Sequence, residues 1–174
     1  MIQFFSDPQG GFFDTSSDHE SLVVRPKSMQ DNATPSGNAM AATVLFKLAG
    51  FTGNGSYTEI AERMLESVQG VVTRYPTGFA QWPVAQSSYV SKPKEIAIIG
   101  DVNEADTQVM LNVVNETYRP FAVVAVGAKD SPIPLLNGRD QVDGKATVYV
   151  CENFACNLPV NDVEKLRELL KIKD

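Results

Sequence analysis

The spacing of apolar residues in the first half of the chain predicts two helices that pack as a hairpin. The string AMAATVLFKLAG follows a TPS sequence at positions 34–36 that favours a helix start, and Gly50 is expected to end this helix. After a turn at positions 52–56, the string YTEIAERMLESVQGVVTRY repeats apolar residues with a helical period. Two helices joined by so short a turn predict an antiparallel hairpin.

A third helix is predicted from Gly78 to Tyr89, after the break that Pro76 introduces. Before the hairpin, residues 10–26 combine a glycine pair, polar residues and a short apolar run, which is typical of an extended or hairpin-like segment. One hairpin and one further helix do not enclose a core, so we expect the isolated chain to self-associate or to expose an apolar face. That face would comprise Val44, Leu45, Leu48, Ile60, Leu65 and Val72.

The second half of the chain changes to short apolar runs of strand length, beginning with KEIAIIGD after a polar SKPK sequence. The runs at positions 96–99 and 123–126 flank a segment with helical spacing at positions 103–118. Strands this apolar, joined through a helix, predict a parallel crossover in a buried sheet. Residues 147–150 are expected to add a third strand to this parallel sheet.

These patterns predict an α/β chain in two parts. Residues 1–92 are expected to form a helical-hairpin region. Residues 93–174 are expected to form a small α/β domain, arranged as three layers around a short parallel sheet. Its last helix, VEKLRELLK, would be capped by Asn161 or Asp162.

Charge and composition narrow the classes of partner. The chain of 174 residues is 43% hydrophobic, which is enough to bury a core, and its net charge of -6 comes with scattered basic residues. This balance disfavours binding to nucleic acid. No stretch is apolar and long enough to span a membrane, and the start of the sequence does not resemble a signal peptide. With two cysteines only, a reducing cytoplasm is the expected location.

The strings DNATPSGNAMAA, KEIAIIGD and YVCENFAC occur in this order and spacing. They resemble the carboxy-terminal part of the thioredoxin-domain-containing family typified by spermatogenesis-associated protein 20. The resemblance implies a larger protein with a thioredoxin-like domain, a barrel of helical hairpins related to six-hairpin glycosidases, and a carboxy-terminal α/β region. On this view residues 1–92 are the end of the α/α barrel. A carbohydrate-related role would rest on the analogy of the barrel, and a fold does not fix a function.

Polar residues before the first long helix are the main candidates for a ligand site. Helix-entry loops of hairpin barrels line the central cavity, so Asp31, Asn32, Ser36 and Asn38 are the residues that we expect to bind a substrate. Thr34 belongs to the same loop. Glycoside hydrolysis needs two carboxylates, and the second would have to come from elsewhere in the protein. The alternative is that these residues only cap the helix and form the turn.

Two other polar features favour structural roles. His19, the single histidine, has no second histidine or cysteine at metal-ligand spacing, which favours an exposed loop position. Gly100 and Asp101 follow a predicted strand, but they lack the glycine spacing of a nucleotide-binding loop, so a turn glycine and a helix-capping acid are expected. No metal and no cofactor are predicted.

The aromatic residues Phe79, Trp82 and Tyr89 could stack on a sugar ring in a barrel mouth. Aromatic residues at this spacing in a helix are more often part of the core, and this is the interpretation that we favour.

Cys151 and Cys156 are separated by four residues, whereas redox-active dithiols of the usual kind have two intervening residues and a helix amino terminus. We therefore expect free thiols that pack near Phe154 and have no oxidoreductase role. A structural disulfide or half of a metal site would also fit the loop.

The sequence leaves two functions open. In the first, the chain contributes part of a cavity, but no complete active site, to a larger carbohydrate-active-like protein. In the second, it is a non-catalytic module that docks other domains or proteins. The expected partners are upstream domains of the same protein, a sugar-like small molecule and further copies of the chain. A nucleotide-binding role for the α/β part ranks third because the phosphate-binding motifs are missing.

Overall fold

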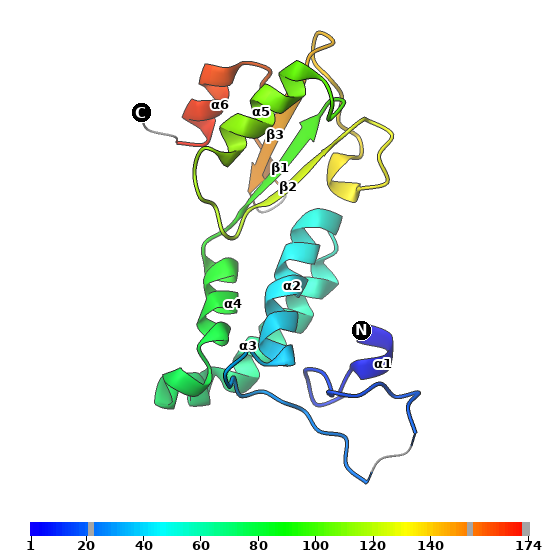
Figure 1. The fold of residues 1–174 in the computed structure, drawn as a ribbon, viewed down its shortest axis with the longest axis vertical. Coiled ribbons are helices and arrows are strands. Elements are labelled where there is room, and N and C mark those ends of the chain that lie inside the picture. Colours follow the sequence, from blue (N-terminus) through cyan, green and yellow to red (C-terminus); the bar gives the residue numbers. More distant parts are fainter. Residues whose placement is uncertain (21–22, 153–154, 172–174) are drawn as a thin grey trace. The chain divides into compact units, whose positions relative to one another are not determined.

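The computed structural model describes residues 1–20, 23–152 and 155–171 (Figure 1). The chain divides into two compact units. The first contains Met1–Ala49 and Asn54–Ser91, and the second contains Gly50–Gly53 and the chain from Lys92 onward. Helices and a sheet both occur, which confirms the predicted α/β class. Within the described ranges, every helix is too short or too polar to cross a lipid bilayer.

All the long helices predicted in the first half are present. They are α2 (Gly37–Thr52), α3 (Gly55–Arg74) and α4 (Gln81–Val90). A short helix, α1 (Ile2–Phe5), begins the chain. The third long helix starts later than expected because Pro76–Gly78 forms a separate 3-10 turn, η1. In the predicted extended segment, Phe12 forms an antiparallel bridge with Ser6, and residues 21–22 lie outside the described residues.

The prediction that Gly50 ends the first long helix is wrong. Helix α2 continues to Thr52, and Gly53 adopts the left-handed conformation, with φ +69°, that turns the chain. Gly50 meets a different requirement, because a Cβ atom there would lie 3.0 Å from Cγ2 of Val123. A pattern of residue types does not distinguish a glycine needed for its backbone angle from one needed for close packing.

The core of the helical unit is formed by one side of each long helix. Its buried members include Ala42, Leu45, Phe46, Ala61, Met64, Val68, Trp82 and Ala85. The predicted apolar face is present in part: Val44 and Leu48 are 43% and 37% exposed, whereas Leu45 is fully buried. Ile60, Leu65 and Val72 are partly buried and pack against the core. The structure therefore leaves the outer side of α2 apolar and covers most of the remaining predicted face.

Asn38 fastens the amino-terminal segment to the start of α2. Its Oδ1 accepts a hydrogen bond from the Phe12 amide at 2.7 Å, and its Nδ2 donates to the carbonyls of Phe12 at 2.9 Å and Ser28 at 3.0 Å. The Asn38 side chain is 1% exposed, so these buried backbone groups cannot bond to water and bond to Asn38 instead. One amide thus satisfies both backbone groups of Phe12.

The second unit is built on a sheet with strand order β2-β1-β3-β4. The strands are β1 (Lys94–Ile99), β2 (Val123–Gly127), β3 (Thr147–Glu152) and β4 (Ala155–Cys156). Strands β1 and β2 are parallel, with Ile96 opposite Val124, as the apolar runs and the intervening helix predicted. That helix is α5 (Ala105–Asn115).

The third strand is present, but its predicted parallel direction is wrong. Strand β3 pairs antiparallel with β1, with Ile98 opposite Val148. A parallel strand would need another crossover, usually a helix, before β3. The chain instead passes through a 3-10 turn, η2 (Pro134–Leu136), and reverses at Asp143 and Gly144, both of which have positive φ. The sheet is therefore mixed.

Both faces of the sheet are covered, as the three-layer prediction requires. On one face, Ile96, Ile98, Val148 and Val150 pack with Met110 and Val113 of α5 and with Leu166 of α6 (Val163–Leu169). Helices α5 and α6 lie side by side over this face (Figure 1). On the other face, Ala97, Ile99 and Val123 pack with Leu135 and Leu136. Asp162 caps α6 by accepting a hydrogen bond from the Lys165 amide, which confirms one of the two predicted caps.

The cysteines form a disulfide, so the prediction of free thiols is wrong. Cys151 in β3 is opposite Cys156 in β4, in antiparallel register. The sequence spacing does not reveal this pairing because it depends on β4 lying antiparallel beside β3. Phe154, around which we expected the thiols to pack, lies outside the described residues.

Asp106 ties the start of α5 to the chain before β3. One carboxylate oxygen accepts from the Thr107 amide at 2.8 Å, and the other accepts from the Ala146 amide at 2.7 Å. The hydrogen bond from Ala146, helped by the one from Thr107, holds the pKa of the Asp106 carboxyl below its ordinary value. A lowered carboxyl pKa stabilises the fold above the pKa of the unfolded chain, and this contribution is lost as the pH falls through the folded-state value.

Replacing Asn38 by Ala is expected to destabilise the helical unit by about 3 kcal/mol, because it leaves the buried amide and carbonyl of Phe12 without partners. Chemical denaturation followed by the fluorescence of Trp82, the single tryptophan, measures this unit. Asn32→Ala serves as the control, because Asn32 is exposed and its side chain accepts a hydrogen bond from the adjacent Ala33 amide. Equal stability of the two variants would contradict the assigned role of Asn38.

Replacing Asp106 by Asn is expected to destabilise the second unit at pH 7, and the difference from the unaltered protein should shrink as the pH falls below the pKa of the Asp106 carboxyl. Amide hydrogen exchange of β1 and β3 is the measurement. Asp130→Asn, at an exposed position, is the control and should show no such pH dependence. A difference that stays constant from neutral to acidic pH would contradict the carboxylate role.

Candidate functional site

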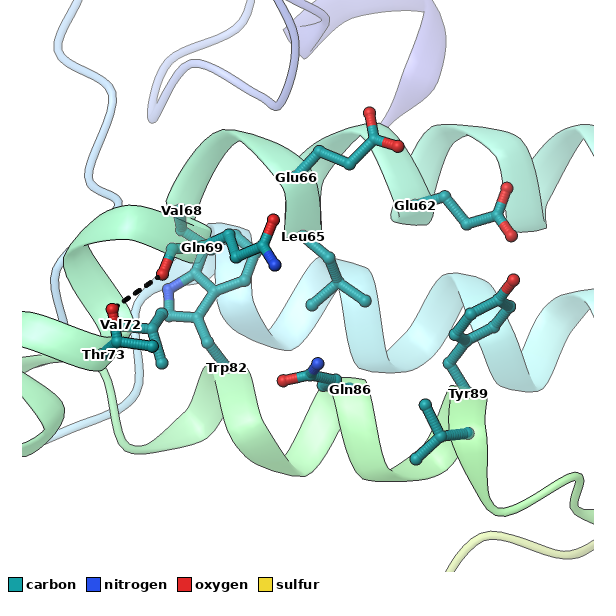
Figure 2. Close-up of a pocket in the computed structure, with 11 residues that line it drawn as sticks. Glu62, Leu65, Glu66, Val68, Gln69, Val72, Thr73, Trp82, Gln86 and Tyr89 are labelled. Carbon is teal, nitrogen blue, oxygen red and sulfur yellow. Dashed lines mark hydrogen bonds between the residues drawn. The ribbon is translucent and has the colours of Figure 1, made fainter.

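A groove lies between α3 and α4 in the helical unit (Figure 2). Its volume is about 420 Å³. Helix α3 contributes Glu62, Leu65, Glu66, Val68, Gln69, Val72 and Thr73, and helix α4 contributes Trp82, Gln86, Tyr89 and Val90. The groove is therefore lined by residues spaced three or four apart on two helices, which is the spacing that puts side chains on one helical face.

The floor of the groove is apolar and belongs to the core of the helical unit. Val68 and Trp82 are buried in the core, and Leu65 and Val72 pack against it. The indole Nε1 of Trp82 donates a hydrogen bond to the Met29 carbonyl at 2.8 Å, which fixes the ring. The core interpretation of Trp82 is therefore confirmed, although the ring still contributes to the groove wall.

The rim of the groove is polar and acidic. Glu62 and Glu66 lie one helical turn apart on α3, and Gln86 projects from α4 toward Leu65 (Figure 2). The Tyr89 hydroxyl donates a hydrogen bond to Glu62, and this bond, together with the negative charge of Glu62 and burial, raises the pKa of Tyr89. The groove thus offers carboxylate acceptors and an amide that both donates and accepts.

The Tyr89 ring stacks on the ring of Phe46 in α2. The two rings stack with their centroids 5.2 Å apart and their planes 27° from each other. Tyr89 therefore presents its hydroxyl to the rim while its ring is occupied by another aromatic side chain.

This arrangement suits binding better than hydrolysis. Glycoside hydrolysis uses two carboxyl groups that flank the bond to be broken, whereas Glu62 and Glu66 both lie on α3. An apolar floor below hydrogen-bonding groups is typical of sites for small polar molecules with an apolar face.

The loop residues predicted as ligand-binding do not line this groove. Asp31 is buried, and its two carboxylate oxygens accept from the backbone amides of Ser36 at 2.7 Å and Gln81 at 2.8 Å. Ser36 accepts from the Ala39 amide and donates to the Met29 carbonyl. Asn32 is exposed.

The structure brings Asp31 and Ser36 together and gives Asn38 its backbone contacts with Phe12 and Ser28. Each of the three side chains forms hydrogen bonds with backbone groups that cap a helix or hold a loop in place. The assignment of Asp31, Asn32, Ser36 and Asn38 to a ligand site stays a prediction.

The remaining polar candidates take structural positions. His19 is exposed. Asp101 accepts from the amide of Asn103 at 2.9 Å, so it holds a turn. The N-cap position of α5 is Glu104, whose side chain makes no cap hydrogen bond, so the expectation that Asp101 caps this helix is wrong. Gly100 is required because a Cβ there would lie 2.3 Å from Oγ1 of Thr107. Among the described residues, no group of three or more His, Cys, Asp and Glu side chains could hold a metal ion.

Sequence reasoning missed Glu62, Glu66, Gln69 and Gln86 as groove residues. The signal was present in the spacing of Glu62, Glu66 and Gln69, which recur at helical intervals next to the apolar stripe of α3. Their importance depends on which helix packs beside that stripe, and the spacing within α3 does not reveal this.

Comparisons with known proteins identify relatives that are much longer than this chain. Human spermatogenesis-associated protein 20 is 31% identical over 174 aligned residues, which cover 96% of this chain and 22% of the human protein. The mouse protein of the same name is 31% identical over 97% of the chain and 22% of its own length. An uncharacterized protein of Caenorhabditis elegans is 23% identical over 91% of the chain and 22% of its own length.

The chain thus spans about a fifth of the length of these relatives. No family model matches it, and no solved structure matches it. The resemblance indicated by the DNATPSGN, KEIAIIGD and YVCENFAC strings is confirmed: over nearly its whole length, the chain is homologous to part of spermatogenesis-associated protein 20.

Proposed function

We propose that this chain supplies one wall of a binding cavity for a neutral, sugar-like molecule within a larger protein, without a complete active site of its own. The groove between α3 and α4 carries the proposal, because it combines an apolar floor with carboxylate and amide groups at its rim. Sugars present hydroxyl groups around an apolar ring face, and such a groove complements both parts of the molecule.

The larger protein in this proposal has an upstream thioredoxin-like domain and a hairpin barrel of which residues 1–92 are the end, and it works in the cytoplasm. The existence of upstream domains is supported by length, since the chain spans about a fifth of the length of its relatives. The catalytic groups of any carbohydrate chemistry would lie in those upstream parts, because Glu62 and Glu66 occupy a single wall of the groove.

The groove can be tested with neutral sugars. Glucose, N-acetylglucosamine and maltose should each be titrated while the fluorescence of Trp82 in the groove wall is measured. We expect a saturable change with at least one of them, and at least about tenfold weaker binding after Glu66→Ala or Gln86→Ala, because each change removes hydrogen bonds to the ligand.

Glu59→Ala is the matched control, because Glu59 is an exposed residue of α3 outside the groove. Its affinity should equal that of the unaltered chain. The same titration on the full-length protein tests whether upstream parts complete the cavity. If the full-length protein gives no saturable change with any of the three sugars, the proposal fails.

A second candidate function, docking of other helices, rests on the outer side of α2. Met40, Val44 and Leu48 recur every four residues, and their exposed fractions are 41%, 43% and 37%. Residues four apart share one helical face, so these partly exposed side chains form an apolar stripe on α2. Upstream hairpins of the same protein are the partner that we propose, with a second copy of the chain as the substitute when those hairpins are missing.

The isolated chain is therefore expected to self-associate through this stripe, and Met40→Lys combined with Val44→Lys is expected to make it monomeric, because buried lysines would lose their hydration. Sedimentation velocity over a range of concentrations measures this. Glu59→Lys adds a positive charge at an exposed position of α3 and should leave association unchanged. An unaltered chain that stays monomeric at all concentrations would rule out the stripe as a contact surface between copies.

A further inference from the structure

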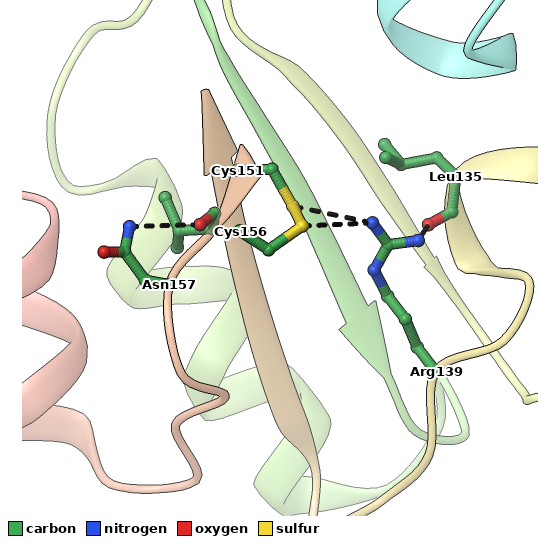
Figure 3. The surroundings of a disulfide bond; sticks show 6 residues. Leu135, Arg139, Cys151, Cys156 and Asn157 are labelled. Atoms are coloured by element: carbon green, nitrogen blue, oxygen red, sulfur yellow. Dashed lines mark hydrogen bonds between the residues drawn. A yellow bond between two sulfur atoms is a disulfide. The ribbon is translucent and has the colours of Figure 1, made fainter. Parts of the chain in front are cut away.

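The disulfide between Cys151 and Cys156 has a positively charged neighbour (Figure 3). One guanidinium nitrogen of Arg139, Nη2, lies 3.5 Å from the Sγ atoms of both cysteines. No requirement of a stable disulfide calls for a cation in contact with both sulfurs, since the oxidised pair is neutral. A cation at this position has its largest electrostatic effect when the bond opens and a thiolate forms.

Arg139 is held in this position by the rest of the second unit. Its other terminal nitrogen, Nη1, donates to the Leu135 carbonyl in η2. The guanidinium also lies 5.7 Å from the ring centroid of Tyr149, and the Tyr149 hydroxyl donates to the Asp140 carbonyl at 2.8 Å. Contacts on two sides therefore keep the charge next to the sulfurs.

The two cysteines differ in accessibility. Cys151 is fully buried in β3, whereas Cys156 in β4 is exposed. A thiolate attacks a disulfide along the sulfur–sulfur axis, so an external thiol can reach Cys156 more readily, and Cys151 then becomes the leaving group. A buried thiolate in apolar surroundings is a poor leaving group unless a cation stabilises it, and Arg139 supplies that cation.

We propose that Cys151, Cys156 and Arg139 form a thiol–disulfide exchange site for external dithiols. The thiolate of the dithiol attacks Sγ of Cys156, a mixed disulfide forms, and the bond to Cys151 breaks with its electron pair on the Cys151 sulfur beside Arg139. The second thiolate of the dithiol then attacks the dithiol sulfur that is bonded to Cys156 in the mixed disulfide. This step closes the disulfide of the dithiol and releases Cys156 as a thiolate. The protein disulfide gains two electrons, the dithiol is oxidised to a disulfide, and its two protons pass through solvent to the two cysteines.

The sheet can keep its structure when this bond opens. The Asn157 amide donates to the Val150 carbonyl at 3.0 Å, and the Asn157 side chain donates to the same oxygen at 3.2 Å. These bonds hold the chain after β4 against β3 independently of the disulfide. This redox role differs from our expectation for the cysteines, because a guanidinium here takes the place of the helix amino terminus that a usual redox dithiol requires.

The test compares the rate at which dithiothreitol reduces the disulfide in the oxidised protein and in Arg139→Gln, with alkylation and mass measurement at successive times. We expect Arg139→Gln to react at least about threefold more slowly, because a leaving thiolate without its cation leaves more slowly. Lys129→Gln is the matched control, since Lys129 lies in the same connection but pairs with Asp140. It should react like the unaltered protein.

A purely structural role for Arg139 predicts the opposite result, because loosening the site would expose both sulfurs and speed up reduction. Reduction of Arg139→Gln at the same rate as Lys129→Gln, or faster, therefore overturns the proposal. A second measurement uses the unaltered protein and does not depend on how the variants fold. After brief exposure to glutathione and alkylation, peptide mapping should find glutathione on Cys156 and the alkyl group on Cys151, and the reverse pattern would also overturn the proposal.

Discussion

Backbone polar groups that leave water must find other partners, and the irregular segments of this chain find them in a few polar side chains. Asn38 serves both backbone groups of Phe12, and Asp31 serves the amides of Ser36 and Gln81. In the second unit, Asp106 accepts from the amide of Ala146. These bonds lie outside the hydrogen bonding of the helices and the sheet. They add to the core packing that holds α4 in the first unit and to the strand pairing that holds β3 in the second, and a hydrophobic pattern does not reveal them.

The sequence predicted the elements better than their connections. The spacing of apolar residues predicted α2, α3 and α5 and the parallel pair of β1 and β2. Elements that are buried on one or both faces have apolar residues at regular intervals or in continuous runs along the sequence. The spacing did not reveal the antiparallel direction of β3, which depends on a reversal at positions 143–144 whose backbone angles no apolar pattern records. The disulfide escaped for a related reason, since it forms only when the chain folds back onto β3.

The residues that line the candidate groove were not predicted from the sequence either. The polar residues that we predicted to bind a ligand, such as Asp31 and Asn38, form hydrogen bonds with backbone groups. Glu66 and Gln86, which line the groove, lie on helices for which the sequence predicted no site. A site between two helices requires a side chain from each, and the pairing of their faces is a property of the packed unit. The same polar residue types bind ligands and stabilise turns, so the two roles can be distinguished only from the hydrogen-bond partners in the structure.

The outer edge of β3 has a consequence for how this domain behaves in concentrated solution. Val148 exchanges backbone hydrogen bonds with Val160, and Val150 accepts from Asn157, so the returning chain occupies the hydrogen-bonding groups that β3 would otherwise present. An unoccupied strand edge is a template on which another molecule can add a strand, and this is a common route to fibrous aggregates. The short return from Cys156 to Val160 thus keeps the outer edge of β3 from pairing with a strand of another molecule.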